Sequence, residues 1–176
     1  MDKAMKTRRL QILTAISLAI SHVAVADDDI EKSAVIRIVD AFFTAMAAKD
    51  VDSMRLMMLP EGTIVGYRES ADGPELVHLT HATYLGNLAA SEDRVVERYW
   101  DPTILLRERL ATVWTYYDLY RNDKFSHCGI NNFSFVKTAE GWRIAGVVFS
   151  MQRESCAASP LGPYQADNEA RGGTSP

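Results

Sequence analysis

The sequence predicts an α+β fold in which a curled antiparallel sheet packs on three N-terminal helices and encloses a cone-shaped cavity. Helical periodicity dominates the chain as far as residue 90. From Arg94 onward, runs of β-branched and aromatic residues alternate with short turn signals. An order in which helices are followed by a meander of strands is typical of an α+β fold and not of a fold with alternating strands and helices. The length of 176 residues fits one domain with short tails.

Three segments have helical character. Residues 30–48 carry an apolar stripe at three- and four-residue steps, and acidic residues precede them where a helix N-terminus favours negative charge. Residues 51–59 predict a second, short helix that Pro60 stops. Thr80 has the position of an N-cap for a third helix that ends near Ala90. The stripe of the first helix consists of Val35, Ile38, Val39, Phe42 and Met46.

The strands follow from residue type and from the turns between them. Residues 63–67 predict a short strand before a loop at residues 70–74. The later strands are expected over residues 95–100, 103–107, 110–121, 124–137 and 142–151, with Asp101-Pro102 between the first two. The turn candidates are Glu108-Arg109, Asn122-Asp123 and residues 138–141.

The N-terminus has the pattern of a secretory signal peptide. A basic start is followed by an uncharged run from Leu10 to Val25, and Ala24-Val25-Ala26 supplies a small-x-small cleavage site. We therefore expect residues 1–26 to be a signal peptide, residues 27–152 to form the cone domain and residues 153–176 to form a mobile tail. The predicted localisation is exported, either periplasmic or secreted. The alternatives are an amphipathic first helix and a membrane anchor.

Charge argues against two classes of partner. Without residues 1–26 the chain keeps 15 basic and 22 acidic side chains, a net charge of −7. Such a protein repels phosphate backbones, so we expect no nucleic-acid partner. We also expect no stable membrane insertion after cleavage, because the uncharged run lies within the leader.

Two stretches resemble a known superfamily. Phe42-Phe43-x-Ala45-Met46 before Lys49-Asp50-Val51-Asp52-Ser53-Met54 resembles the opening helix pair of nuclear transport factor 2-like (NTF2-like, SnoaL-like) domains. The segment Phe133 to Thr138, followed by Gly141-Trp142-Arg143-Ile144, is similar to the final hairpin of these domains. The resemblance covers about residues 30–151 and implies a cystatin-like cone fold. Phe125-Ser126-His127-Cys128-Gly129 resembles a motif of an exported branch described as lumazine-binding.

The resemblance implies a small-molecule pocket but assigns no reaction. The superfamily includes isomerases, dehydratases, epoxide hydrolases, cyclases and non-catalytic binding or dimerising domains, so the fold does not fix the function. None of the catalytic motifs of these enzymes matches the chain residue by residue. Candidate site residues must therefore come from strand geometry.

Cys128 and Cys156 are the only cysteines, and in an exported protein they most simply form one disulfide. The alternative is two free, buried thiols. Neither cysteine has further ligands at zinc spacing, and His78 and His81 lack partners nearby, so the sequence predicts no metal site and no cofactor. Both histidines are expected to face solvent at the start of the third helix.

Strand parity predicts the lining of the cone. Phe133 and Phe135 set the inward face of their strand, which also carries His127 and Asn131. A two-residue turn at Asn122-Asp123 pairs Arg121 with Lys124. Counting back places Asp118 opposite His127, Tyr116 opposite Gly129 and Trp114 opposite Asn131. Pairing Lys137 with Trp142 adds Val148 to this face, and Tyr67 is expected at its edge.

The predicted lining supports two functions. The first is non-catalytic binding of a small molecule by Trp114, Tyr116, Asn131, Val148 and Tyr67. The second is proton transfer on a carbonyl compound by an Asp118–His127 pair. The pair could also be a buried polar contact without catalytic use. A third hypothesis is a purely dimerising module, since Arg98, Tyr99 and Trp100 suggest a homodimer through the sheet.

Overall fold

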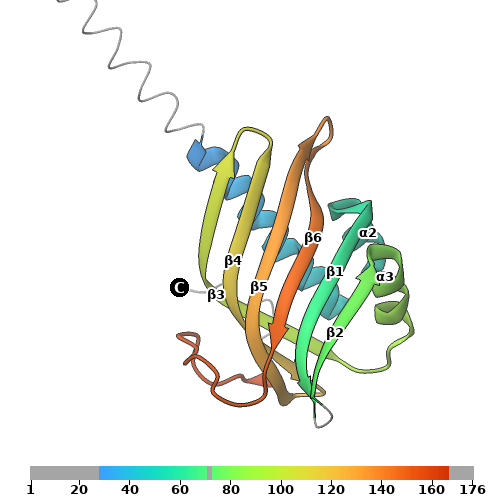
Figure 1. The fold of residues 1–176 in the computed structure, drawn as a ribbon, viewed down its shortest axis with the longest axis vertical. Coiled ribbons are helices and arrows are strands. Elements are labelled where there is room, and N and C mark those ends of the chain that lie inside the picture. The colour runs from blue at the N-terminus through green and yellow to red at the C-terminus, as the bar shows by residue number, and fades with distance from the viewer. Residues whose placement is uncertain (1–27, 71–72, 167–176) are drawn as a thin grey trace, which may run out of the picture.

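The computed structural model describes residues 28–70 and 73–166. Its first helix, residues 28–48, crosses one face of a six-stranded sheet (Figure 1). The helices α2 (Val51–Met57) and α3 (His81–Ala90) lie at one end of that sheet beside β1 and β2. The predicted signal peptide, residues 1–26, falls outside the described residues.

The sheet has the order β2-β1-β6-β5-β4-β3 and is open at both edges. Its strands are β1 (Met58–Ser70), β2 (Gly73–Thr80), β3 (Val95–Arg107), β4 (Leu110–Arg121), β5 (Lys124–Thr138) and β6 (Gly141–Met151). All neighbours are antiparallel except β1 and β6, which run parallel. The sheet is therefore mixed rather than wholly antiparallel, and its one parallel pair joins two strands that are not consecutive in the chain.

The helical stripe predicted from sequence forms the core. Val35, Val39, Phe42 and Met46 are buried against the sheet, and Ile38 packs at the edge of the same cluster. The ring of Phe133 contacts both Phe42 and Phe43, with centroids 5.5 and 5.7 Å apart. The inward parity of Phe133 and Phe135 is confirmed, because both are almost fully buried.

Two boundaries near α2 differ from the sequence-based expectation. Helix α2 ends at Met57, and Pro60 lies inside β1. Proline is tolerated there because the β1–β6 register shifts between Met58 and Thr63, so no regular ladder needs its missing N–H. The segment expected as a loop at residues 70–74 leads into β2, a strand that periodicity missed because its side chains are mostly exposed.

The third helix is confirmed in detail, with the Thr80 side chain accepting the backbone N–H of Thr83. His81 corrects another expectation: it is buried, and its Nδ1 lies 2.7 Å from the Leu59 carbonyl oxygen. A Cβ added at Gly62 would come within 2.0 Å of the His81 ring, so the glycine makes room for this histidine. Burial lowers the pKa of His81, which favours the neutral ring.

Candidate functional site

The concave face of the sheet and the helices enclose a cavity of about 340 Å³. Most of its wall is apolar, with Phe42, Phe43 and Met46 from the first helix and Leu88 from α3. The sheet contributes Phe133, among other apolar residues. A mostly apolar cavity with a few polar groups is the usual form of a small-molecule site. The polar and titratable side chains of this cavity are Glu97, Asn131, His127, Arg121, Tyr84, Tyr117, Asn87 and Ser91.

Glu97, on β3, is the carboxyl group of this cavity. Asn131 Nδ2 donates to Glu97 Oε1 at 2.6 Å from β5. The side chain keeps some accessible surface toward the cavity, but protein surrounds it. Burial raises the pKa of Glu97 to about 8 against the opposing effect of the Asn131 hydrogen bond, and the negative charge of Asp118 raises it further. Glu97 therefore holds a proton through most of the neutral range.

His127 lines the same cavity from β5. Its Nδ1 lies 3.0 Å from Ser126 Oγ, and its ring meets the Tyr117 ring edge to face at 5.7 Å. Burial lowers the pKa of His127 to about 4, and the positive charges of Arg121 and Arg153 add to the effect. His127 is therefore a neutral imidazole in this cavity.

Two buried tyrosines complete the polar set. Tyr84 Oη lies 3.1 Å from Met46 Sδ, and Tyr117 Oη donates to the Ser150 carbonyl oxygen at 2.8 Å. Burial raises the pKa of both phenols, and the nearby Glu97 adds to the effect. Both tyrosines therefore keep their protons at neutral pH and serve as hydrogen-bonding groups rather than bases.

The predicted Asp118–His127 pair is wrong, and a single-residue bulge explains why. The turn at Asn122-Asp123 and the pairing of Arg121 with Lys124 are confirmed. The register then shifts between Leu119 and Tyr120, which leaves Ser126 without a partner in β4. Leu119 consequently lies opposite His127, and Asp118 lies opposite Cys128. A one-residue shift moves a side chain to the other face of a sheet.

Asp118 forms an ion pair on the outer face. Its carboxylate accepts bonds from Arg98 Nε at 2.9 Å and from Arg98 Nη2 at 2.5 Å. Only 11% of the Arg98 side chain and 8% of the Asp118 side chain are exposed. The tail covers the pair, because Arg98 also donates to the Gly162 carbonyl oxygen and lies 5.8 Å from the Tyr164 ring centroid. Asp118 therefore pairs with Arg98, the residue that contacts the tail, instead of pairing with His127.

The same shift separates the predicted ligand-binding residues. Asn131 faces the inner cavity as expected. Trp114 lies opposite Asn132 and Tyr116 opposite Ile130, so both are on the outer face. Val148 and Tyr67 are also on the outer face, where Val148 is 52% exposed while its neighbour Val147 is 6% exposed and lines the cavity. A second shift, between Ser134 and Phe135 in the β5–β6 ladder, moved Val148 outward.

Sequence reasoning missed Glu97 altogether. A weak signal was present, because Glu97 alternates with Val95 and Tyr99, and the side chains at these alternate positions of β3 lie on the helix side of the sheet. Tyr99 therefore points inward, where its hydroxyl donates to Asp40, and not toward a dimer face. The inference needed both the parity of β3 and its place in the sheet, and the alternation suggested only the parity.

Cys128 and Cys156 form the predicted disulfide, with Cα atoms 5.9 Å apart. Within residues 28–70 and 73–166, no group of three or more His, Cys, Asp or Glu side chains could hold a metal ion. No helix in the described part of the chain is long and apolar enough to cross a membrane.

Solved structures share this architecture. An NTF2-like protein with a cystatin-like fold from Novosphingobium aromaticivorans is similar with a TM-score of 0.61 and 13% identity, over 81% of this chain and 95% of that one. The chain has the NTF2-like fold. An NTF2-like superfamily protein from Salmonella enterica serovar Typhimurium has a TM-score of 0.58 and 14% identity, over 78% of this chain and 99% of that one.

A third NTF2-like structure carries a functional description. A proposed dehydratase of the NTF2-like family from Streptomyces avermitilis has a TM-score of 0.57 and 14% identity, over 71% of this chain and 98% of that one. No family model and no curated protein matches the sequence. At these identities the likeness establishes the NTF2-like fold alone.

Proposed function

We propose that the inner cavity binds a small, neutral, mainly apolar molecule that carries one polar group. The observation that supports this most is Glu97, a carboxyl group on the wall of an apolar cavity that accepts a hydrogen bond from the side-chain amide of Asn131. A protonated carboxyl can donate a hydrogen bond to a carbonyl or hydroxyl oxygen. The cavity volume of about 340 Å³ falls within the range of small-molecule sites.

Two neighbouring valines give a matched test. Val147→Phe adds volume inside the cavity, whereas Val148→Phe adds the same volume on the outer face. With N-phenylnaphthylamine as a neutral fluorescent probe and camphor as a carbonyl competitor, the wild type and Val148→Phe should bind the probe and release it to camphor. Val147→Phe should lose most of the probe signal while keeping its fold by circular dichroism. Equal probe binding in both variants would refute the site.

A second candidate function is proton transfer on a carbonyl compound. It is favoured by Glu97, because a carboxyl with a pKa of about 8 can exchange protons near neutral pH. The similarity in fold to a proposed dehydratase agrees with such chemistry. In this function the Glu97 carboxylate takes a proton from the carbon next to the carbonyl and later returns one.

Deuterium exchange separates binding from proton transfer. If the protein is an enzyme of this kind, it should accelerate exchange at the α-carbon of a bound ketone, measured by NMR in deuterated buffer. Glu97→Gln should abolish the acceleration, and Glu92→Gln, on the exposed surface, should leave it unchanged. Probe binding without any exchange would leave non-catalytic binding as the function.

Export is proposed as well. The leader-like residues 1–26 support it, and a disulfide suits an oxidising compartment. Expression with its own leader should give a protein outside the cytoplasm whose first residue is Asp27, as read by mass spectrometry. Cytoplasmic protein that retains Met1 would contradict the proposal.

A further inference from the structure

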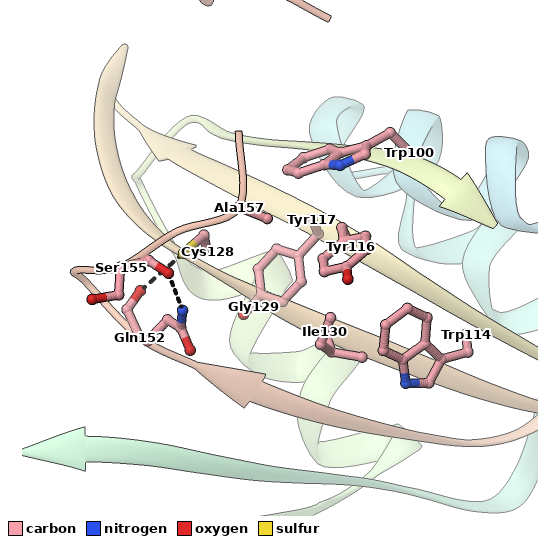
Figure 2. Close-up of a pocket in the computed structure, with 10 residues that line it drawn as sticks. All are labelled: Trp100, Trp114, Tyr116, Tyr117, Cys128, Gly129, Ile130, Gln152, Ser155 and Ala157. Atoms are coloured by element: carbon pink, nitrogen blue, oxygen red, sulfur yellow. Dashed lines mark hydrogen bonds between the residues drawn. The ribbon is translucent and has the colours of Figure 1, made fainter. Parts of the chain in front are cut away.

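A second cavity, of about 410 Å³, lies on the outer face of the sheet (Figure 2). Aromatic side chains of β3 and β4 form one side of it, and the segment after β6 forms the other. It is separate from the candidate site above, since the sheet lies between the two. Tyr117 alone lines both cavities.

Strand geometry builds the aromatic side. Trp114 and Tyr116 are two residues apart on β4 and share its outer face, and Trp100 of β3 lies opposite Tyr116. The rings of Trp100 and Tyr116 are stacked at 6.0 Å, while Trp114 meets Tyr116 edge to face at 5.1 Å. Figure 2 shows the two tryptophans on either side of Tyr116. Ile130, opposite Tyr116 on β5, extends this surface.

The disulfide positions the opposite wall. Cys128 bonds to Cys156, and the residues on both sides of Cys156, Ser155 and Ala157, line the cavity. Gln152 exchanges backbone hydrogen bonds with Cys128 at 2.9 Å, and its Nε2 donates to the Ser155 carbonyl oxygen at 3.0 Å. We call residues 152–157 the strap. The cavity has two walls because the disulfide holds the strap over the sheet.

The cavity combines an aromatic, uncharged lining with several hydrogen-bond donors. None of its ten lining residues carries a charged side chain. The indole N–H groups of Trp100 and Trp114 and the hydroxyl of Tyr116 make no hydrogen bond within the described part of the chain. Trp100 is only 6% exposed as a residue, but its indole N–H keeps some accessible surface, because His81 Nε2 is the one fully buried side-chain N or O atom without a partner among the described residues. Three donors around one cavity suit a ligand that brings oxygen acceptors.

The distance between the aromatic rings of the cavity limits the shape of that ligand. A flat ring held between two others needs roughly 7 Å between them, twice a van der Waals contact of about 3.5 Å. Trp100 and Tyr116 are 6.0 Å apart, so no ring fits between them. A ligand must therefore stack on one side only, where Trp114 is 39% exposed. A pyranose ring has this form, with a C–H face for stacking and oxygens along its edge.

We propose that the strap cavity binds a neutral saccharide, with one pyranose ring on Trp114 and with ligand oxygens accepting from the free aromatic donors. A charged sugar is disfavoured, because the uncharged lining would not compensate for its desolvation. The proposal does not depend on the function of the inner cavity.

Tryptophan fluorescence tests the proposal directly. The chain has three tryptophans, and Trp142 lies elsewhere, with its Nε1 donating to Glu31. In a Trp142→Phe background, titration with methyl glucoside, methyl galactoside, cellobiose and chitobiose at millimolar concentrations should give a saturable change with at least one of them. Trp114→Ala should weaken that binding at least tenfold. Leu105→Ala, an exposed residue on the same sheet outside the cavity, should leave it unchanged.

The strap supplies two independent variants. Cys156→Ser should weaken saccharide binding, because it releases the wall of the cavity. Ala157→Trp should block binding by filling the cavity from the strap while the sheet stays intact. Each variant should keep the circular dichroism spectrum of the wild type, which confirms that it is folded.

Three outcomes would overturn the proposal. The first is no saturation by any of the four saccharides. The second is saccharide binding that Trp114→Ala and Ala157→Trp leave unchanged. The third is saturation by guaiacol, a neutral aromatic probe, without saturation by a saccharide. Sedimentation of the same samples measures a further outcome. A stable dimer that excludes saccharides would also contradict the proposal, because it would assign the surface to a second copy of the chain.

Discussion

Each of the two faces of strands β3, β4 and β5 carries a buried carboxyl group, and the two groups have different hydrogen-bond partners. On the outer face Asp118 accepts two bonds from Arg98, and the tail closes over the pair. On the inner face Glu97 has the amide of Asn131 as its partner, and burial raises its pKa to about 8. One carboxyl is matched by a cation and has a structural role. The other faces a cavity and holds a proton that a ligand could use.

The difference follows from how much compensation each protonation state needs when a carboxyl group is buried. A buried ion pair needs a close partner and further hydrogen bonds to offset its lost hydration. The outer face provides both, through Arg98 and the tail. A protonated carboxyl needs less compensation, and it remains able to donate. Glu97 is therefore the carboxyl group on which the proposed function rests, although sequence reasoning chose Asp118.

Breaking the outer pair should have the largest effect. Asp118→Asn leaves the Arg98 charge buried without its carboxylate, and loss of one partner of a buried pair costs about 4 kcal/mol in unfolding free energy. Urea unfolding measures this directly. The matched control is Asp52→Asn, whose ion pair with Arg55 has side chains 88% and 62% exposed. That control should change stability by less than about 0.5 kcal/mol. Similar losses in both variants would show that the buried pair contributes no more to stability than the exposed one.

Preventing ionisation of the inner carboxyl should have a smaller effect, and one that depends on pH. The folded pKa of Glu97 is about 8 against an ordinary 4.5, so its stabilising contribution is present below pH 4.5 and is lost as pH rises toward 8. Glu97→Gln does not titrate. Its stability relative to wild type should therefore rise across this window by about 3 kcal/mol. Unfolding at a series of pH values is the measurement, with Glu92→Gln following the wild-type curve. A pH-independent difference would mean that Glu97 is ionised in the fold.

The smallest effect is expected at His127, on the acid side. Its folded pKa of about 4 lies below the ordinary 6.5, so wild-type stability falls as pH drops from 6.5 toward 4, where the unfolded chain takes up the proton first. His127→Gln should flatten this decline by about 2–3 kcal/mol. His78→Gln, at an exposed position, should keep the full decline. An NMR titration of His127 with a midpoint above 6.5 would contradict its burial as a neutral ring.

Local chemistry predicted much of the fold. The periodicity of residues 30–48, the Thr80 cap, the Asn122-Asp123 turn and the parity of Phe133 and Phe135 all depend on residues close together in the chain. Two cysteines allow only one intramolecular pair, so the disulfide was determined once an oxidising compartment was assumed. These features are governed by short-range sterics and burial, which a sequence displays directly.

The composition of the site was decided by the tertiary structure. One unpaired residue, Ser126, moved Asp118, Tyr116 and Trp114 to the outer face, while His127 and Asn131 stayed inside. No local property of Ser126 marks it as the bulge, because its position depends on how the whole β4–β5 ladder fits the curvature of the sheet. The pairing of Glu97 with Asn131 joins β3 to β5 across β4. Such contacts depend on sheet order and register, and these are set by packing of the whole sheet against the helices.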